Sequence, residues 1–130
     1  KEFLKDQLSK AGYELRDLGP ASAESIDYPD IARPVCESVQ QGECTRGILI
    51  CGTGIGISIT ANRYKGIRAA LCGDCFSAEA TRLHNDANIL AMGARVVGPG
   101  LALKIVDTFL DTPFSGAERH ARRIRMIDED

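Results

Sequence analysis

The sequence has little of several features that would narrow its function at once. It contains no tryptophan and only 5% aromatic residues, and its 16 basic and 18 acidic side chains leave a formal net charge of −2. Such a balance gives no overall attraction for nucleic acid or for an anionic membrane. The longest uncharged stretch, residues 47–62, is too short and too polar to span a bilayer. We therefore expect neither a nucleic acid nor a membrane as a partner.

The cysteines do not form the pattern of a disulfide framework. There are five of them, an odd number, scattered through apparent helices and strands. Residues 1–10 alternate charged and apolar side chains, unlike a secretory signal. Both observations favour reduced thiols and a cytoplasmic location. With 130 residues, the chain has the size of one domain (1–130) with its own core.

Short apolar runs alternate with amphipathic segments along most of the chain. The order β-α-β-α-β predicts a three-layer α/β/α sandwich, with a Rossmann-like parallel sheet and helices on both faces. In such sheets ligands bind beyond the carboxyl ends of the strands. We expect strands at 13–18, 46–51, 66–72 and 88–92, and helices at 3–11, 31–39, 57–64, 77–83 (with Ser77 as N-cap), 99–110 and 117–127.

A glycine-rich turn, Cys51-Gly-Thr-Gly-Ile-Gly56, follows the apolar run at 46–51. Free backbone N–H groups between a strand and a helix stabilise anions. The glycine spacing fits neither a dinucleotide fingerprint nor a Walker A loop. Asp74 nevertheless stands where a ribose-binding acid would, so a nucleotide site remains an alternative, as does a simple tight turn.

Cys51 is the chemically distinctive residue of this turn. At a strand end facing a helix N-terminus, the local partial positive charge favours a thiolate that could act as base or nucleophile. The alternative is a small apolar filler. Cys72 and Cys75 have the spacing of a redox motif, but no helix is expected to start between them, and we interpret that spacing as coincidence.

Two further groups of residues could serve a phosphorylated ligand. His84 could exchange protons near neutral pH and Asn85 could hydrogen-bond a hydroxyl, and we expect both near the sheet edge of Cys51. Arg119 and Arg123 are four residues apart, so a helix would present them on one face as a phosphate clamp. The alternatives are a surface histidine that caps its helix and a solvated basic face balanced by the acidic C-terminal residues.

In combination these motifs resemble the B-type ribose-5-phosphate isomerases and the related galactose-6-phosphate isomerase subunits. The resemblance covers essentially the whole chain. It is most specific in the segments Ile48-Leu-Ile-Cys-Gly-Thr-Gly-Ile-Gly-Ile-Ser58, Asn62-Arg-Tyr-Lys-Gly-Ile-Arg-Ala69, His84-Asn-Asp-Ala-Asn-Ile-Leu90 and Gly93-Ala-Arg-Val-Val-Gly98.

The resemblance implies an aldose–ketose isomerase that works through an enediolate without metal or cofactor. Cys51 resembles the base, and His84 the group that opens the sugar ring. Thr53 and the turn amides resemble the cradle for the developing oxyanion. The residues matching substrate contacts are Gly52, Gly54, Ile55, Gly56, Asn85 and Arg95, with Arg119 and Arg123 as the phosphate clamp. The resemblance also implies a homodimer with shared active sites, and members of the family often pair further into tetramers.

The start of the chain departs from the family's pattern. In this resemblance, family members begin with a short apolar strand ending in Asp-His, then a turn and a helix, and we expect this sequence to open within that helix. We expect that about 15 residues are missing, estimated from a strand, a turn and a first helical turn. The sheet would then be one parallel strand short at its centre, and the polypeptide could be poorly active.

The favoured hypothesis is the interconversion of ribose 5-phosphate and ribulose 5-phosphate. A six-carbon substrate, allose or galactose 6-phosphate, is the nearest variant. A non-catalytic sugar-phosphate-binding or nucleotide-binding module and an inactive partner subunit are the alternatives from other classes. Retention of Cys51, His84, Arg119 and Arg123 argues against the inactive subunit.

Overall fold

The structure is a computed structural model that describes residues 1–19 and 27–129. Helices alternate with short strands from α2 onward, as the apolar pattern predicts. The elements in chain order are α1 (Glu2–Lys10), α2 (Tyr28–Gln40), β1 (Gly47–Cys51), α3 (Ile55–Ala61), β2 (Ala69–Leu71), α4 (Cys75–Asn85), β3 (Ile89–Gly93), α5 (Pro99–Asp111) and α6 (Glu118–Glu129).

The three strands form a parallel sheet in the order β1-β3-β2. In the register of β1 and β3, Gly47 lies beside Ile89 and Cys51 lies beside Gly93. All five residues of the central strand β3 are buried, which explains its continuous apolar sequence. The predicted parallel sheet is therefore confirmed, although β2 is shorter than the run at 66–72 suggested.

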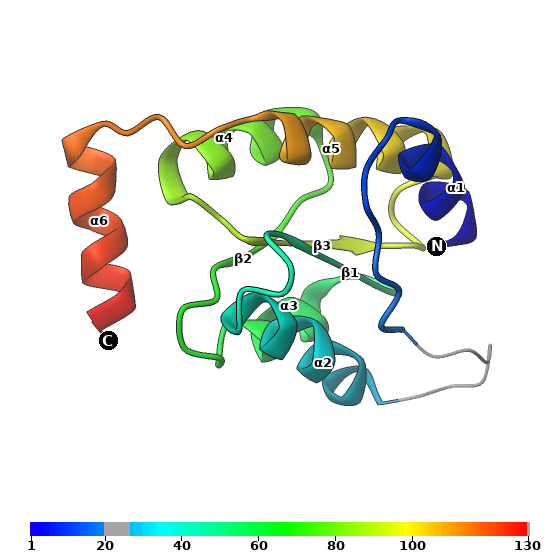
Figure 1. Ribbon diagram of the computed structural model, residues 1–130, viewed down its shortest axis with the longest axis horizontal. Helices are drawn as coiled ribbons and strands as arrows, with labels where there is room; N and C mark the ends of the chain where they lie inside the picture. The colour runs from blue at the N-terminus through cyan, green and yellow to red at the C-terminus, as the bar shows by residue number, and fades with distance from the viewer. Residues whose placement is uncertain (20–26, 130) are drawn as a thin grey trace.

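Helices cover both faces of the sheet, so the three-layer prediction is also confirmed (Figure 1). Alternate residues of β3 point into two cores. Leu90 and Met92 pack with α1, α4 and α5, whereas Ile89 and Ala91 pack with α2 and α3. Within residues 1–19 and 27–129, no helix combines the length and apolar character needed to cross a bilayer.

Three local expectations are wrong. Residues 13–18 form no strand, because side chains rather than a backbone ladder hold the segment: the Tyr13 hydroxyl donates to Asp111 at 2.7 Å, and Lys5 bonds Asp17 at 2.7 Å. Helix α3 begins at Ile55 instead of residue 57. The N-cap of α4 is Asp74 instead of Ser77, and its carboxylate accepts from the Ser77 N–H at 2.6 Å.

The C-terminal helix α6 stands apart from the sandwich at one end of the molecule (Figure 1). It spans Glu118–Glu129, close to the predicted 117–127. Of its twelve residues only His120 is buried. The far end of the helix is held by Arg68, whose guanidinium bonds Asp128 at 3.0 Å. Most of α6 is therefore free to contact another molecule.

Candidate active site

The glycine-rich turn at the end of β1 is pinned to the segment that follows β3. The Ala94 N–H donates to the Cys51 carbonyl at 2.8 Å, and the Arg95 N–H donates to the Gly52 carbonyl at 3.0 Å. At Gly93 an added Cβ would lie 2.6 Å from the carbonyl carbon and oxygen of Thr53. Only glycine permits this approach, so the turn is held in one position against the end of β3.

The Cys51 thiol lies at the mouth of this turn, half-buried. Its Sγ accepts a hydrogen bond from the Gly54 N–H at 3.2 Å. Gly54 has a φ of +82°, a conformation that favours glycine and that aims its N–H back at the sulfur. The Thr53 hydroxyl accepts from the Ile55 N–H at 3.2 Å and so closes the first turn of α3. The backbone conformation of the turn therefore places the thiol beside the Gly54 N–H donor.

Arg95 adds a positive charge beside the same turn. Its Nε and Cδ lie 3.8 Å from the position that a Cβ on Gly52 would occupy. The guanidinium and the turn amides together suit a negatively charged group. We call the set formed by Cys51, residues 52–56 and Arg95 the carboxyl-edge cluster, since it follows the carboxyl ends of β1 and β3.

His84 and Asn85 end helix α4, next to a tightly held loop. Asp86 adopts a left-handed conformation with φ of 46°, and its carboxylate accepts from the Arg82 guanidinium at 2.7 Å. Arg82, 2% exposed, also bonds the carbonyls of Ala87 and Thr112. The Asn85 side-chain carbonyl accepts from the Thr81 hydroxyl at 3.0 Å. This network fixes the backbone that carries His84.

Sequence reasoning did not single out His120, which lies against His84. The two ring centroids are 4.5 Å apart, with a 40° angle between the planes. His120 Nδ1 is 2.8 Å from the Ser115 hydroxyl oxygen. One feature of the sequence could have indicated His120: it is the second of the chain's two histidines and falls inside the arginine-rich segment. Its packing on His84 depends on how α6 is placed, which the sequence alone does not give.

Arg119 and Arg123 lie on α6 on either side of His120, with their side chains exposed. None of the ion pairs among the described residues involves either of them, whereas Arg125 on the same helix bonds Glu118 at 2.8 Å. Unpaired guanidiniums one helical turn apart can grip a phosphate. We call His84, Asn85, His120, Arg119 and Arg123 the amino-edge cluster.

The two clusters lie at opposite edges of the sheet, which corrects the expectation that His84 is near Cys51. His84 precedes β3, whose first residue Ile89 pairs with Gly47, whereas Cys51 ends β1 beside Gly93. A strand of this length spans roughly 13 Å. Figure 1 shows α6 and the end of α4 at one end of the molecule, and β3 running away from them toward the opposite side. A single chain does not bring all the candidate residues together.

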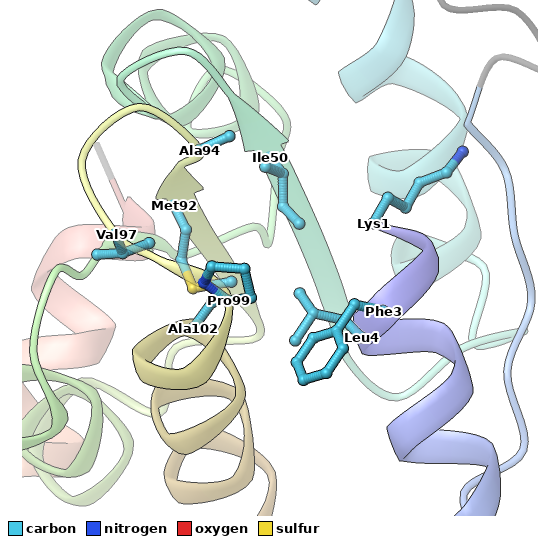
Figure 2. Close-up of a pocket in the computed structure, with 9 residues that line it drawn as sticks. All are labelled: Lys1, Phe3, Leu4, Ile50, Met92, Ala94, Val97, Pro99 and Ala102. Atoms are coloured by element: carbon cyan, nitrogen blue, oxygen red, sulfur yellow. The ribbon is translucent and has the colours of Figure 1, made fainter.

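A pocket of about 130 Å³ lies on the other face of the sheet from Cys51 (Figure 2). Ile50 and Met92 point into it from the sheet. The rest of its lining comes from the start of the chain with α1, from the segment between β3 and α5, and from α5. Apart from Lys1, the lining side chains are apolar. Apart from Lys1, the lining of this pocket therefore offers no side chain for proton transfer.

Comparison with known proteins agrees with the fold. A sequence model of the Ribose/Galactose Isomerase family matches residues 1–127. The solved ribose-5-phosphate isomerase B of Clostridium thermocellum is 55% identical, with a TM-score of 0.96 over 98% of this chain and 86% of that chain. Ribose-5-phosphate isomerase B of Escherichia coli (strain K12) is 49% identical over 98% of this chain and 85% of its own length. D-erythrulose-4-phosphate isomerase of Pectobacterium atrosepticum is 43% identical over 89% of this chain and 77% of its own length.

The fold and these similarities define a sugar-phosphate isomerase of the aldose–ketose class. The chain belongs to the ribose/galactose isomerase family, among the B-type ribose-5-phosphate isomerases. The alternative of a nucleotide site relied on Asp74 as the acid that binds the ribose. In the structure the Asp74 carboxylate instead caps α4, where it accepts from the Ser77 N–H and hydroxyl.

Proposed function

We propose that this protein interconverts ribose 5-phosphate and ribulose 5-phosphate in active sites shared between two copies of the chain. The observation that carries the proposal is the Cys51 thiol, held by the Gly54 N–H in a turn rich in amide donors and flanked by Arg95. The similarity to isomerases named for ribose 5-phosphate supports the choice of substrate.

The carboxyl-edge cluster suits the proton transfer between the two sugar carbons. Cys51 takes the proton from C2 of the open-chain aldose, and the electron pair moves through C1 onto the carbonyl oxygen. Amides of residues 52–56, with Thr53 and Arg95, stabilise the resulting enediolate, since a base alone cannot overcome the weak acidity of this proton. Returning the proton to C1, with transfer of the C2 hydroxyl proton to O1, completes the ketose.

The amino-edge cluster suits the steps before that transfer. In ring opening the C1–O4 bond breaks, the C1 hydroxyl gives up its proton and O4 gains one, and His84 can carry this proton. Asn85 can bond a sugar hydroxyl. Arg119 and Arg123 can hold the phosphate and keep the open chain in place for Cys51.

A symmetric dimer reunites the two clusters. In an isologous pair, the amino-edge cluster of one copy meets the carboxyl-edge cluster of the other, and the symmetry makes two such sites. One chain cannot do this, since a whole strand separates its own clusters.

Exposed apolar side chains near both clusters support the same assembly. Ile55, Ile59 and Phe76 are 52%, 58% and 81% exposed, around the starts of α3 and α4 near the carboxyl edge. Met126 and Ile127 of α6 are 62% and 54% exposed. Exposed apolar groups gathered beside a functional edge are typical of an interface between chains. We also place the enzyme in the cytoplasm, where five free thiols stay reduced.

The activity is tested with purified protein and ribose 5-phosphate, by following the ketose formed. We expect turnover that Cys51→Ala abolishes and that Cys44→Ala, another half-buried free thiol, leaves intact. Allose 6-phosphate, galactose 6-phosphate and erythrose 4-phosphate are assayed alongside, and a higher kcat/KM for one of them would replace the pentose. Thermal stabilisation by these sugars without any turnover would indicate a binding module instead.

The shared site is tested by mixing two inactive variants. Cys51→Ala damages one cluster and His84→Asn the other, so a mixed dimer contains one doubly damaged site and one intact site. Random reassociation of equal amounts should restore about a quarter of the normal activity, since half of the dimers are mixed and each has one working site. Sites built within one chain would give no recovery.

A further inference from the structure

We propose that His120 is a positioning residue, which holds the His84 imidazole and ties it to the helix that carries Arg119 and Arg123. The inference rests on the proposed function, because it takes ring opening as the task of His84.

The His84–His120 contact packs the one buried residue of α6 against the end of α4. His120 is 6% exposed and is the one buried residue of that helix. Its ring centroid lies 4.5 Å from that of His84, with the planes tilted by 40°, within the range of favourable aromatic pairs. His84 cannot leave this orientation without losing the contact.

Ser115 anchors His120 from the other side. The Ser115 hydroxyl oxygen accepts from the Ala117 N–H at 3.2 Å, and it lies 2.8 Å from His120 Nδ1. The hydroxyl can bond Nδ1 either as donor or as acceptor, according to the tautomer of the ring. In both cases the bond ties Nδ1 to Ser115, so Ser115 fixes the orientation of the His120 ring.

The surroundings also keep His120 neutral. Burial, together with His84, Arg119 and Arg123, lowers the pKa of His120. A neutral ring adds no second positive charge beside His84, which has to gain and lose a proton during ring opening.

The phosphate clamp and the residue that orients His84 are also neighbours on one helix, so binding the phosphate and opening the ring depend on the same rigid element.

The experiment separates steps that need ring opening from steps that do not. Ribulose 5-phosphate forms no ring, because its 5-hydroxyl carries the phosphate. Exchange of its C1 proton with D₂O therefore needs the Cys51 proton transfer but not the ring-opening step. Conversion of ribose 5-phosphate needs both. Both rates are measured for the unsubstituted protein and for each variant.

We expect His120→Ala to lower kcat/KM for ribose 5-phosphate by about 100-fold, because a misplaced catalytic group costs about that much. The rate of C1 proton exchange in ribulose 5-phosphate should fall by less than about threefold. His120→Phe keeps a ring against His84, so its kcat/KM for ribose 5-phosphate should be about tenfold higher than that of His120→Ala. Glu118→Gln, on the same turn of α6 but without contact to His84, is the control and should leave both rates unchanged. An equal fall in both rates, or no fall in either, would overturn the proposal.

Nuclear magnetic resonance of histidine-labelled protein distinguishes failure of this inference from failure of the proposed function. We expect an Overhauser contact between the His84 and His120 ring protons. Its absence in an active enzyme overturns the positioning role alone. Its presence in a protein that isomerises no sugar phosphate overturns the proposed function, and with it the ring-opening role on which this inference depends.

Discussion

The α-carbon of Gly93 faces the backbone of Thr53 so closely that a Cβ on Gly93 would lie 2.6 Å from the Thr53 carbonyl carbon. We predict that Gly93→Ala shifts the turn, removes most of the isomerase activity and lowers the free energy of unfolding by about 2 kcal/mol, a typical cost of overpacking. Gly100→Ala is the control, since nothing lies within 4 Å of an added Cβ there. Inside α5 it should stabilise the fold by about 0.5–1 kcal/mol. Equal urea midpoints for the two variants would contradict this account.

Asp86 combines a left-handed backbone with a carboxylate bonded to the buried Arg82. Asp86→Ala keeps the conformational strain and leaves Arg82 without this partner, so it should cost about 3 kcal/mol of unfolding free energy. Asp86→Gly also loses the carboxylate but relieves the strain, and should cost roughly 1 kcal/mol less. Chemical denaturation of both variants checks the order, and a glycine variant less stable than the alanine variant would refute it.

The thiols of Cys36 and Cys72 should differ in reactivity from the others. They are 0% and 2% exposed, and burial raises the pKa of each to about 11. At pH 8 both are therefore protonated and covered, so iodoacetamide should modify Cys44 and Cys75 well before either of them. Peptide mass spectrometry gives the order, with urea-unfolded protein as the control in which all five cysteines react. Equal rates in the folded protein would contradict the prediction.

Phe76 tests the surface that we assign to the second copy, because it is 81% exposed at the start of α4. Phe76→Asp should convert dimers to monomers in sedimentation experiments and lower activity at dilute protein, since a charge buried in an apolar interface is costly. Leu101→Gln, at a 41% exposed position on α5, should leave the dimer intact. Dimers that survive Phe76→Asp would show that the interface lies elsewhere.

The sequence predicted the layers of the fold better than the placement of the site. Period and apolar character were enough for β1, β3 and their helices, because buried parallel strands are apolar throughout. The segment at 13–18 alternates like a strand but its side chains bond to α1 and α5. His84 was assigned to the wrong edge of the sheet. It precedes β3, whereas Cys51 ends the parallel strand β1, so the two residues lie at opposite ends of the strands. The burial of His120 could not be predicted, since it depends on the long-range packing of α6.

His120 should also make stability depend on pH in a defined direction. Its pKa in the folded protein is lowered by burial, by His84 from α4 and by Arg119 and Arg123 on its own helix, below the value of about 6.5 expected when unfolded. As pH falls through about 6.5, the unfolded chain takes up a proton that the folded chain resists, so the free energy of unfolding falls. Urea unfolding at pH 7.5 and pH 5.5 should show this loss in the unsubstituted protein and a smaller loss in His120→Phe, whose ring does not titrate. If both proteins lose equal stability over this range, the acid sensitivity comes from other groups and His120 is not held neutral by its surroundings.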